Sequence, residues 1–284
     1  MLNLDFASIM TILISGLCTG GVYGLFASSF TFQCGSLNIT DFSFGSWLML
    51  AMYMTFFMYS YKGWHISIIP LIIVLFICYF IISYFLSKHV LSKRNEFVNM
   101  IITMGISLVI QNAAILFFTS YPRTLGIIEK TITIGIGIQI GLTKLIMLFL
   151  SAVILIGFQI FLNRTWTGKT IRAVVQQKEV AYLMGINADR VKNLAFAISY
   201  VLLAASGIML MILFSVEPTA GSFYQMMSFL ICIIAGLGNM RGAFYSGLLI
   251  GVIIGFLNIF ISQFAMAFLF FIFVIILVVK PKGL

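Results

Sequence analysis

Few side chains in this sequence have the types and spacing that covalent chemistry needs. The nearest match is Gly168-Lys169-Thr170, which looks like the end of a phosphate-binding loop. That loop needs a glycine where this chain has Asn163, and it needs a preceding strand where this chain has a long apolar run. We therefore expect no ATP hydrolysis by this chain, so any ATPase would be a separate protein.

The cysteines do not suggest a metal centre or a disulfide framework. They are scattered along the chain, and all lie in or beside apolar runs. Buried cysteine behaves as a small hydrophobic residue. We expect no metal, no other cofactor and no catalytic residue, so the chain should not be an enzyme. The residues concerned are Cys18, Cys34, Cys78 and Cys232.

Asp41 is a candidate functional residue because an ionisable side chain inside an apolar region is costly and often functional. With Ser43 it could hydrogen-bond the amine or hydroxyl groups of a small molecule. The alternative is that Asp41 caps the helix that follows it, which is a common role for aspartate. Its place at the edge of an apolar run slightly favours the cap, and both interpretations stay open.

Thr103, Ser107 and Gln111 recur at every fourth residue and so share one face of a predicted helix. In an apolar helix such a stripe faces protein or water and not lipid. It would either line a polar pathway or hydrogen-bond neighbouring helices, each bond contributing about 1 kcal/mol. The sequence favours neither interpretation over the other.

The composition shows which elements must position these residues. Apolar residues make up 62% of the 284 residues and charged residues only 8%, whereas soluble domains average about 25% charged. A globular protein of this size has too little interior to bury so much apolar surface. We expect an all-α polytopic bundle of transmembrane helices, which excludes a soluble enzyme.

Apolar windows of about 20 residues predict about eight to nine spans in a single domain, residues 1–284. The N-terminal run has no basic region before it and no cleavage site after it, so we expect it to be retained as a span. The seventh and ninth spans are short for a full crossing. The predicted spans are residues 9–32, 42–59, 66–86, 98–118, 142–162, 194–214, 226–237, 243–261 and 264–279.

Two groups of glycines are predicted to be structural. Gly236, Gly238 and Gly242 interrupt the apolar pattern near the C-terminus and indicate a break or a re-entrant turn. The first span carries a face of small residues, which favours close packing of helices over a functional role. This face consists of Thr19, Gly20, Gly21 and Gly24.

The basic residues predict the orientation of the chain. With the N-terminus outside, twelve of the 16 lysines and arginines fall on the cytoplasmic side, as the positive-inside rule requires. The C-terminus should then be cytoplasmic, and the formal net charge of +9 reflects topology and not nucleic-acid binding. The longest cytoplasmic segment, residues 163–193, could bind a partner. The longest outer segment, residues 119–141, could cap a pore or receive a binding protein.

Residues 179–185, Glu-Val-Ala-Tyr-Leu-Met-Gly, resemble the E-A-A-x-x-x-G loop of ABC importer permeases. A short surface helix that ends at Gly185 in a left-handed cap would form a compact knob. Such a knob fits a cleft on an ATPase and would move with it as a rigid body. An amphipathic loop helix that contains Glu179 and Gly185 by chance is the alternative.

Further matches follow in the same order along nearly the whole chain. They are residues 168–191, residues 103–112, Glu217-Pro-Thr-Ala-Gly221, Gly236-Leu-Gly-Asn-Met-Arg-Gly242, Gly247 with Gly251, and Lys280-Pro-Lys-Gly-Leu284. On these grounds the chain resembles the hydrophobic (branched-chain) amino acid ABC permeases, known as the LIV or HAAT type.

One segment departs from that family. Residues 41–46, Asp-Phe-Ser-Phe-Gly-Ser, align with a family segment that usually reads N-F-A-H-G-E. They are closer to the D-L-S-x-G-S of related sugar permeases. Because this segment lies near the middle of the family's transport path, urea, short amides, other amino acids and simple sugars stay open as substrates.

The resemblance implies a permease subunit in a bacterial plasma (inner) membrane. It would pair with a second homologous permease, identical or distinct, above two ABC ATPases and below an extracytoplasmic solute-binding protein. Coupling to the ATPase would use Arg172, Glu179, Ala181 and Gly185, and the translocation path would use Asp41, Ser43, Thr103, Ser107 and Gln111.

Two other classes of membrane protein fit the sequence less well. An ion-coupled secondary transporter would usually place functional charges deep in its spans, whereas nearly all charges here lie at span ends. A structural or assembly protein would have no use for the loop at residues 179–185.

Overall fold

The computed structural model describes residues 6–37, 39–62, 68–91, 95–127, 130–134 and 138–260, with a few residues between 264 and 278. These form a bundle of α-helices with one two-stranded antiparallel hairpin, in which Thr131 pairs with Gly141. The elements are α1 (Phe6–Leu37), α2 (Phe44–Lys62), α3 (Ile68–Leu86), the π-helical η2 (Ser87–Leu91), α4 (Glu96–Phe118), β1 (Thr131–Ile134), β2 (Ile138–Gly141), α5 (Leu142–Arg164), α6 (Trp166–Gln176), α7 (Lys178–Leu183), α8 (Ala188–Leu213), α9 (Ala220–Ala235) and α10 (Met240–Phe260).

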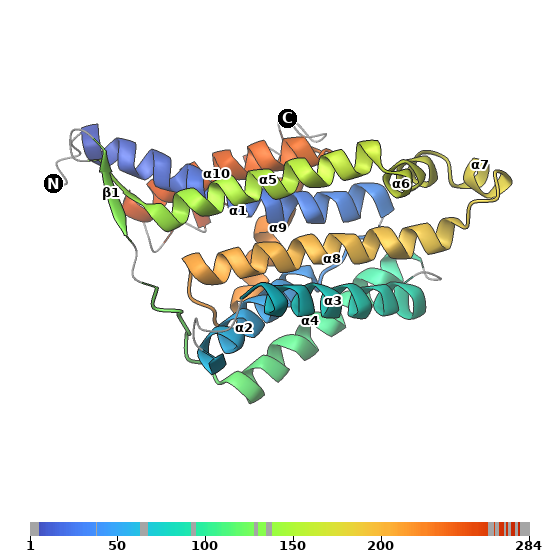
Figure 1. Cartoon of the computed structure of the whole chain (residues 1–284), viewed down its shortest axis with the longest axis horizontal. Helices are drawn as coiled ribbons and strands as arrows, with labels where there is room; N and C mark the ends of the chain where they lie inside the picture. Colours follow the sequence, from blue (N-terminus) through green and yellow to red (C-terminus); the bar gives the residue numbers. More distant parts are fainter. Residues whose placement is uncertain are drawn as a thin grey trace.

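The long helices lie side by side, and the two ends of the bundle differ (Figure 1). The N-terminus and β1 lie at one end, whereas α6 and α7 project from the other. Large apolar side chains remain exposed on the outside of the bundle, among them Phe85 of α3, Leu116 of α4 and Phe149 of α5. This arrangement is that of an all-α polytopic membrane protein.

Six helices in the described part of the chain are long and apolar enough to cross a membrane. The predicted spans 42–59 and 226–237 are not among these six helices. They correspond to α2 (Phe44–Lys62) and to α9, which has only 16 residues, about 24 Å at 1.5 Å per residue. It begins at Ala220 and not at residue 226, because the polar residues Ser222 and Gln225 lowered the hydropathy of its first half. The predicted span 264–279 falls largely outside the described residues.

Two other boundaries differ from the sequence prediction. Residues 163–193 were predicted as one cytoplasmic segment with a single short helix that ends at Gly185, but they contain α6, α7 and the first turn of α8. Helix α8 begins at Ala188 because the side chain of Asn187 accepts a hydrogen bond from the amide of Arg190. Capping residues and an amphipathic pattern determine where these helices begin. A hydropathy window detects only the apolar part of α8 and therefore places its start too late.

Helices α1 and α10 pack together more extensively than any other pair, along matching rows of glycine. A Cβ atom added at Gly247 or Gly251 would lie 2.3 Å from the Cα of Gly24 or Gly20, respectively. Such spacing brings the two backbones into direct contact, which is a frequent basis of helix association in membranes. The small-residue face predicted on the first span therefore packs against another helix at Gly20 and Gly24.

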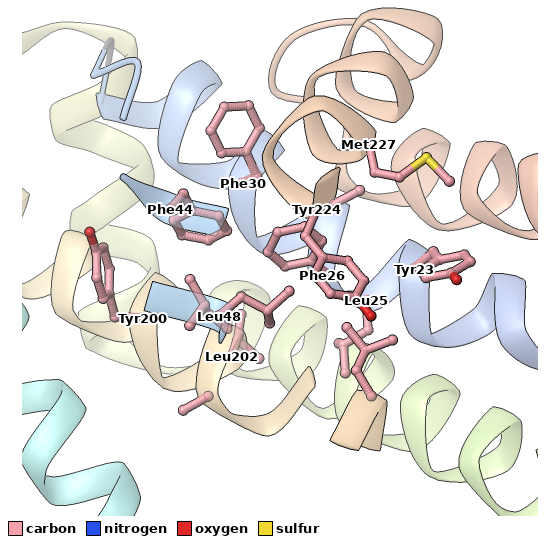
Figure 2. Close-up of a cluster of buried hydrophobic side chains, with 14 of the residues drawn as sticks. Tyr23, Leu25, Phe26, Phe30, Phe44, Leu48, Tyr200, Leu202, Tyr224 and Met227 are labelled. Atoms are coloured by element: carbon pink, nitrogen blue, oxygen red, sulfur yellow. The ribbon is translucent and has the colours of Figure 1, made fainter. Parts of the chain in front are cut away.

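Aromatic side chains fill the centre of the bundle (Figure 2). Phe26 and Phe30 of α1 both contact Phe44 at the start of α2, and Phe44 contacts Tyr200 of α8 edge to face. Tyr224 of α9 contacts Phe26 in the same manner. Four helices are thus tied together beside the point where α2 begins.

Candidate functional site

The polar stripe on α4 makes hydrogen bonds to α2, to α9 and to the turn before α2. The hydroxyl of Thr103 accepts a hydrogen bond from the amide of Phe42 at 3.1 Å. Ser107 Oγ lies 2.7 Å from Ser46 Oγ, and Gln111 Nε2 donates to Ser222 Oγ at 2.7 Å. Each of the three predicted residues therefore has a partner on a neighbouring segment.

Beside this stripe lies a groove of about 530 Å³ between α4 and α9. Ser107, Gln111, Ser222 and Gln225 supply its polar groups. Methionine, leucine, isoleucine and phenylalanine side chains form the rest, and none of the described residues that line the groove is ionisable. The apolar lining consists of Phe42, Met104, Leu108, Met226, Phe229, Leu230 and Ile233.

Thr103 and Ser107 differ in their relation to the groove. Thr103 is fully buried and also donates to the carbonyl oxygen of Asn99, so it ties α4 to Phe42 and does not line the groove. Ser107 and Gln111 line it. The groove is open on one flank, where Met104, Leu108 and Met226 are each more than half exposed.

Asp41 lies next to the groove but is enclosed by its own hydrogen-bond partners. One carboxylate oxygen accepts from the backbone amide and the hydroxyl of Ser43, at 2.8 and 2.6 Å. The other accepts from Gln33 Nε2 at 3.3 Å and from the hydroxyl of Tyr200. Asp41 and Ser43 are both fully buried. This arrangement organises the turn before α2, which begins at Phe44.

Gln225 joins the groove to this turn, and the sequence analysis did not single it out. Its side-chain oxygen accepts from the amide of Gly45 at 2.6 Å, and its Nε2 donates to the carbonyl oxygen of Asp41 at 3.1 Å. Both ends of the amide are used, so the side chain is held in place. A glutamine side chain within an apolar stretch could have indicated a functional position, but the predicted span 226–237 began one residue after Gln225.

The glycine-rich segment forms a tight turn between α9 and α10. Gly236 and Gly238 have φ angles of +82° and +85°, which side chains other than glycine rarely adopt. A Cβ on Gly35 would lie 2.1 Å from the Cα of Gly238, so the turn rests against the end of α1. Gly242 donates its amide to Asn239 Oδ1 in the first turn of α10.

The other predicted site is at the end of the bundle from which α6 and α7 project (Figure 1). Helix α6 begins at a cap in which Thr165 Oγ1 accepts from the amide of Gly168. Arg172 Nη1 donates to Asn163 Oδ1 at 3.0 Å, which ties α6 to the end of α5. Glu179 is exposed on α7.

A glycine ends α7 in a Schellman motif. Gly185, with φ +79°, donates its amide to the carbonyl oxygen of Tyr182, and Ile186 donates to that of Ala181. Ala181 is buried in a small apolar cluster with Val174 and Ala188, which fixes α7 to α6 and α8. The apolar tip that results is exposed, with Leu183 at 87% and Met184 at 77%.

Among the described residues, no group of three or more histidine, cysteine or acidic side chains is placed to hold a metal. The two predicted sites differ in kind. One is a weakly polar groove along the helices, and the other is an apolar knob at the end of the bundle.

Residues 12–279 match the family model described as branched-chain amino acid transport system / permease component. The chain belongs to this family. It is similar to the high-affinity branched-chain amino acid transport system permease proteins BraD of Pseudomonas aeruginosa and LivH of Escherichia coli K12, with 24% and 22% identity. Each alignment covers 96% of this chain and 94% of the relative.

The ribose import permease protein RbsC of Haemophilus influenzae is also similar, with 30% identity over 59% of this chain and 52% of the relative. No solved structure matches the chain. The permease is therefore a multi-pass protein of the bacterial plasma (inner) membrane, in a family of transport subunits of ABC importers.

Proposed function

We propose that this permease forms the translocation path of an ATP-driven importer for branched-chain or other hydrophobic amino acids. The observation that carries the proposal is the groove between α4 and α9, which combines an apolar lining with four polar side chains. Polar groups in a membrane face protein or water, so the groove is suited to a solute that is partly polar. Its apolar lining suits an aliphatic side chain.

The open flank of the groove supports a second permease subunit. Met104, Leu108 and Met226 would meet lipid in an isolated chain, and lipid would leave the nearby polar groups without water. A second homologous permease, identical or distinct, would close this side and complete the path. A solute-binding protein outside would deliver the solute.

The knob at α7 supports coupling to two ABC ATPases. Leu183 and Met184 expose apolar side chains on a short helix whose end is fixed by Gly185 and whose base is fixed by Ala181. A rigid apolar knob transmits the movement of a docked partner to α5 and α8. We assign Arg172 to hold α6 against α5 and Glu179 to contact the ATPase. With the α7 knob on the cytoplasmic side, where the ATPases bind, the N-terminus is outside and the C-terminus is cytoplasmic.

A simple sugar is the second candidate substrate. The similarity to a ribose permease and the Asp-Phe-Ser-Phe-Gly-Ser segment favour it. The direct test is uptake of radiolabelled L-leucine and D-ribose by cells that express the permease with its neighbouring transport genes. ATP-dependent uptake of leucine supports the proposal. Uptake of ribose alone would reject the amino acid assignment and retain the importer.

Leu183→Asp together with Met184→Asp is expected to abolish co-purification of the ATPase with the tagged permease. Truncating a central anchor of an interface typically costs about 2–4 kcal/mol, and here a charge is also added to an apolar contact. Both side chains are exposed, so the permease itself should fold normally. Gln176→Asp, at an exposed position of α6, is the matched control. Equal recovery of ATPase with the double variant and the control would contradict the docking role.

A further inference from the structure

Two of the four polar side chains of the groove, Gln111 and Ser222, lie at one end of it. Gln111 pairs with Ser222, which lies in the first turn of α9. Met104 lies seven residues before Gln111 on α4, about 10 Å away along the helix axis, and it lines the groove together with Phe229 of α9. The groove thus has a polar end at Gln111 and Ser222 and an apolar end to which Phe42, Met226 and Phe229 contribute.

Gln111 and Ser222 retain hydrogen-bonding capacity after they bind each other. With Gln111 Nε2 donating to Ser222 Oγ, the amide oxygen of Gln111 is left to accept and the serine hydroxyl is left to donate. If Oε1 and Nε2 of the Gln111 amide are exchanged, the Ser222 hydroxyl donates to Gln111 Oε1. Ser222 Oγ can then still accept a hydrogen bond, and the two hydrogens of Gln111 Nε2 can still donate. In either orientation an acceptor lies next to a donor.

Gln225 differs from this pair because its amide is already engaged. It binds the amide of Gly45 and the carbonyl oxygen of Asp41, and only 8% of the residue is exposed. We treat Gln225 as a positioning residue that holds α9 against the start of α2. The Gln225 side chain is therefore held in place, whereas the Gln111–Ser222 pair has hydrogen-bonding groups left for a ligand.

From this geometry, and resting on the proposed function, we infer a subsite for an amphiphilic zwitterion. Gln111 accepts from the ammonium group of an amino acid, Ser222 donates to its carboxylate, and the aliphatic side chain packs against Phe42, Met226 and Phe229. The volume of about 530 Å³ lies within the range of small-molecule sites. Selection among amino acids would then depend on the size of the apolar end.

The lack of ionised side chains in the lining fits a transport subsite. A transported solute must bind well enough to enter and weakly enough to leave. A hydrogen bond between neutral groups contributes little net free energy, and one to a charged group contributes about twice as much. Two such bonds hold a zwitterion briefly, whereas an ion pair in an apolar groove would retain it.

The first test compares Gln111→Leu with Asn112→Leu in the complete transporter. Asn112 is the next residue on α4, is exposed, and does not line the groove. Gln111→Leu is expected to lower the maximal rate of L-leucine uptake about tenfold, which corresponds to one lost hydrogen bond to a charged group. Asn112→Leu should retain the rate of the unmodified transporter. Equal rates for the two variants would overturn the subsite.

The second test uses size selection, which a purely structural role would not change. Met226 is more than half exposed, so Met226→Ala should fold normally and widen the apolar end. The uptake of L-phenylalanine relative to L-leucine should rise about fivefold. Val109→Ala, at an exposed position of α4 outside the groove, should leave the ratio unchanged. An unchanged ratio with Met226→Ala would also overturn the subsite.

These outcomes are separate from failure of the proposed function. If the unmodified transporter takes up no amino acid, the function itself is rejected before any variant is compared. If it takes up leucine, and Gln111→Leu and Met226→Ala behave as their controls do, the importer stands and the subsite is rejected.

Discussion

Asp41→Ala is expected to prevent the permease from accumulating as a folded protein. The carboxylate of Asp41 accepts hydrogen bonds from Ser43, Gln33 and Tyr200, which come from three parts of the chain. Each buried donor left without an acceptor costs about 1–3 kcal/mol. Because at least three donors lose their partner, the free energy of unfolding should fall by several kcal/mol, on the order of the total stability of many domains.

The measurement is the yield of monodisperse permease after extraction in detergent, together with its thermal unfolding temperature. Asp41→Asn keeps the shape and one acceptor oxygen, so it should retain part of the yield. Ser43→Ala removes one donor and leaves Asp41 intact, so its effect should be smaller. If Asp41→Ala instead gave a normal yield and abolished only uptake, Asp41 would contact the solute, as the other interpretation of its sequence position holds.

Several features were predictable because their signals are local. The glycine at position 185 ends α7 in a left-handed conformation, and that requirement is visible in the sequence as a glycine after a short helix. The glycines at 236 and 238 indicated a turn for the same reason. The apolar runs predicted the long helices, since the bilayer sets their length.

Other features depend on contacts between distant segments. The sequence could not decide between two roles for Asp41, because Tyr200, one of its partners, lies 159 residues away. Gln225 went unnoticed because its importance comes from Gly45 and Asp41, 180 and 184 residues away. The short helix α9 was misplaced because Gln225 is buried against the protein, whereas a hydropathy window treats every residue as facing lipid.

The second large effect is expected at the contact between α1 and α10. Gly251→Leu should separate these two helices, since even a Cβ at this position would lie 2.3 Å from the Cα and 2.5 Å from the nitrogen of Gly20. It would also lie 2.4 Å from the carbonyl oxygen of Gly16. All three are backbone atoms, so no side-chain rotation relieves the overlap, and the cost should exceed the 1–3 kcal/mol that is typical of overpacked cores.

Gly157→Leu is the matched control, because a Cβ on this glycine of α5 meets no atom within 4 Å. Both variants place leucine in a membrane helix, so they differ only in whether that position is packed against another backbone. Thermal unfolding in detergent should show a much lower midpoint for Gly251→Leu, and Gly157→Leu should match the unmodified protein. Gly251→Ala should lie between them, since the first added carbon already overlaps Gly20. Equal midpoints for Gly251→Leu and Gly157→Leu would contradict the close approach of α1 and α10, because a contact that admits leucine at no cost cannot bring the two backbones together.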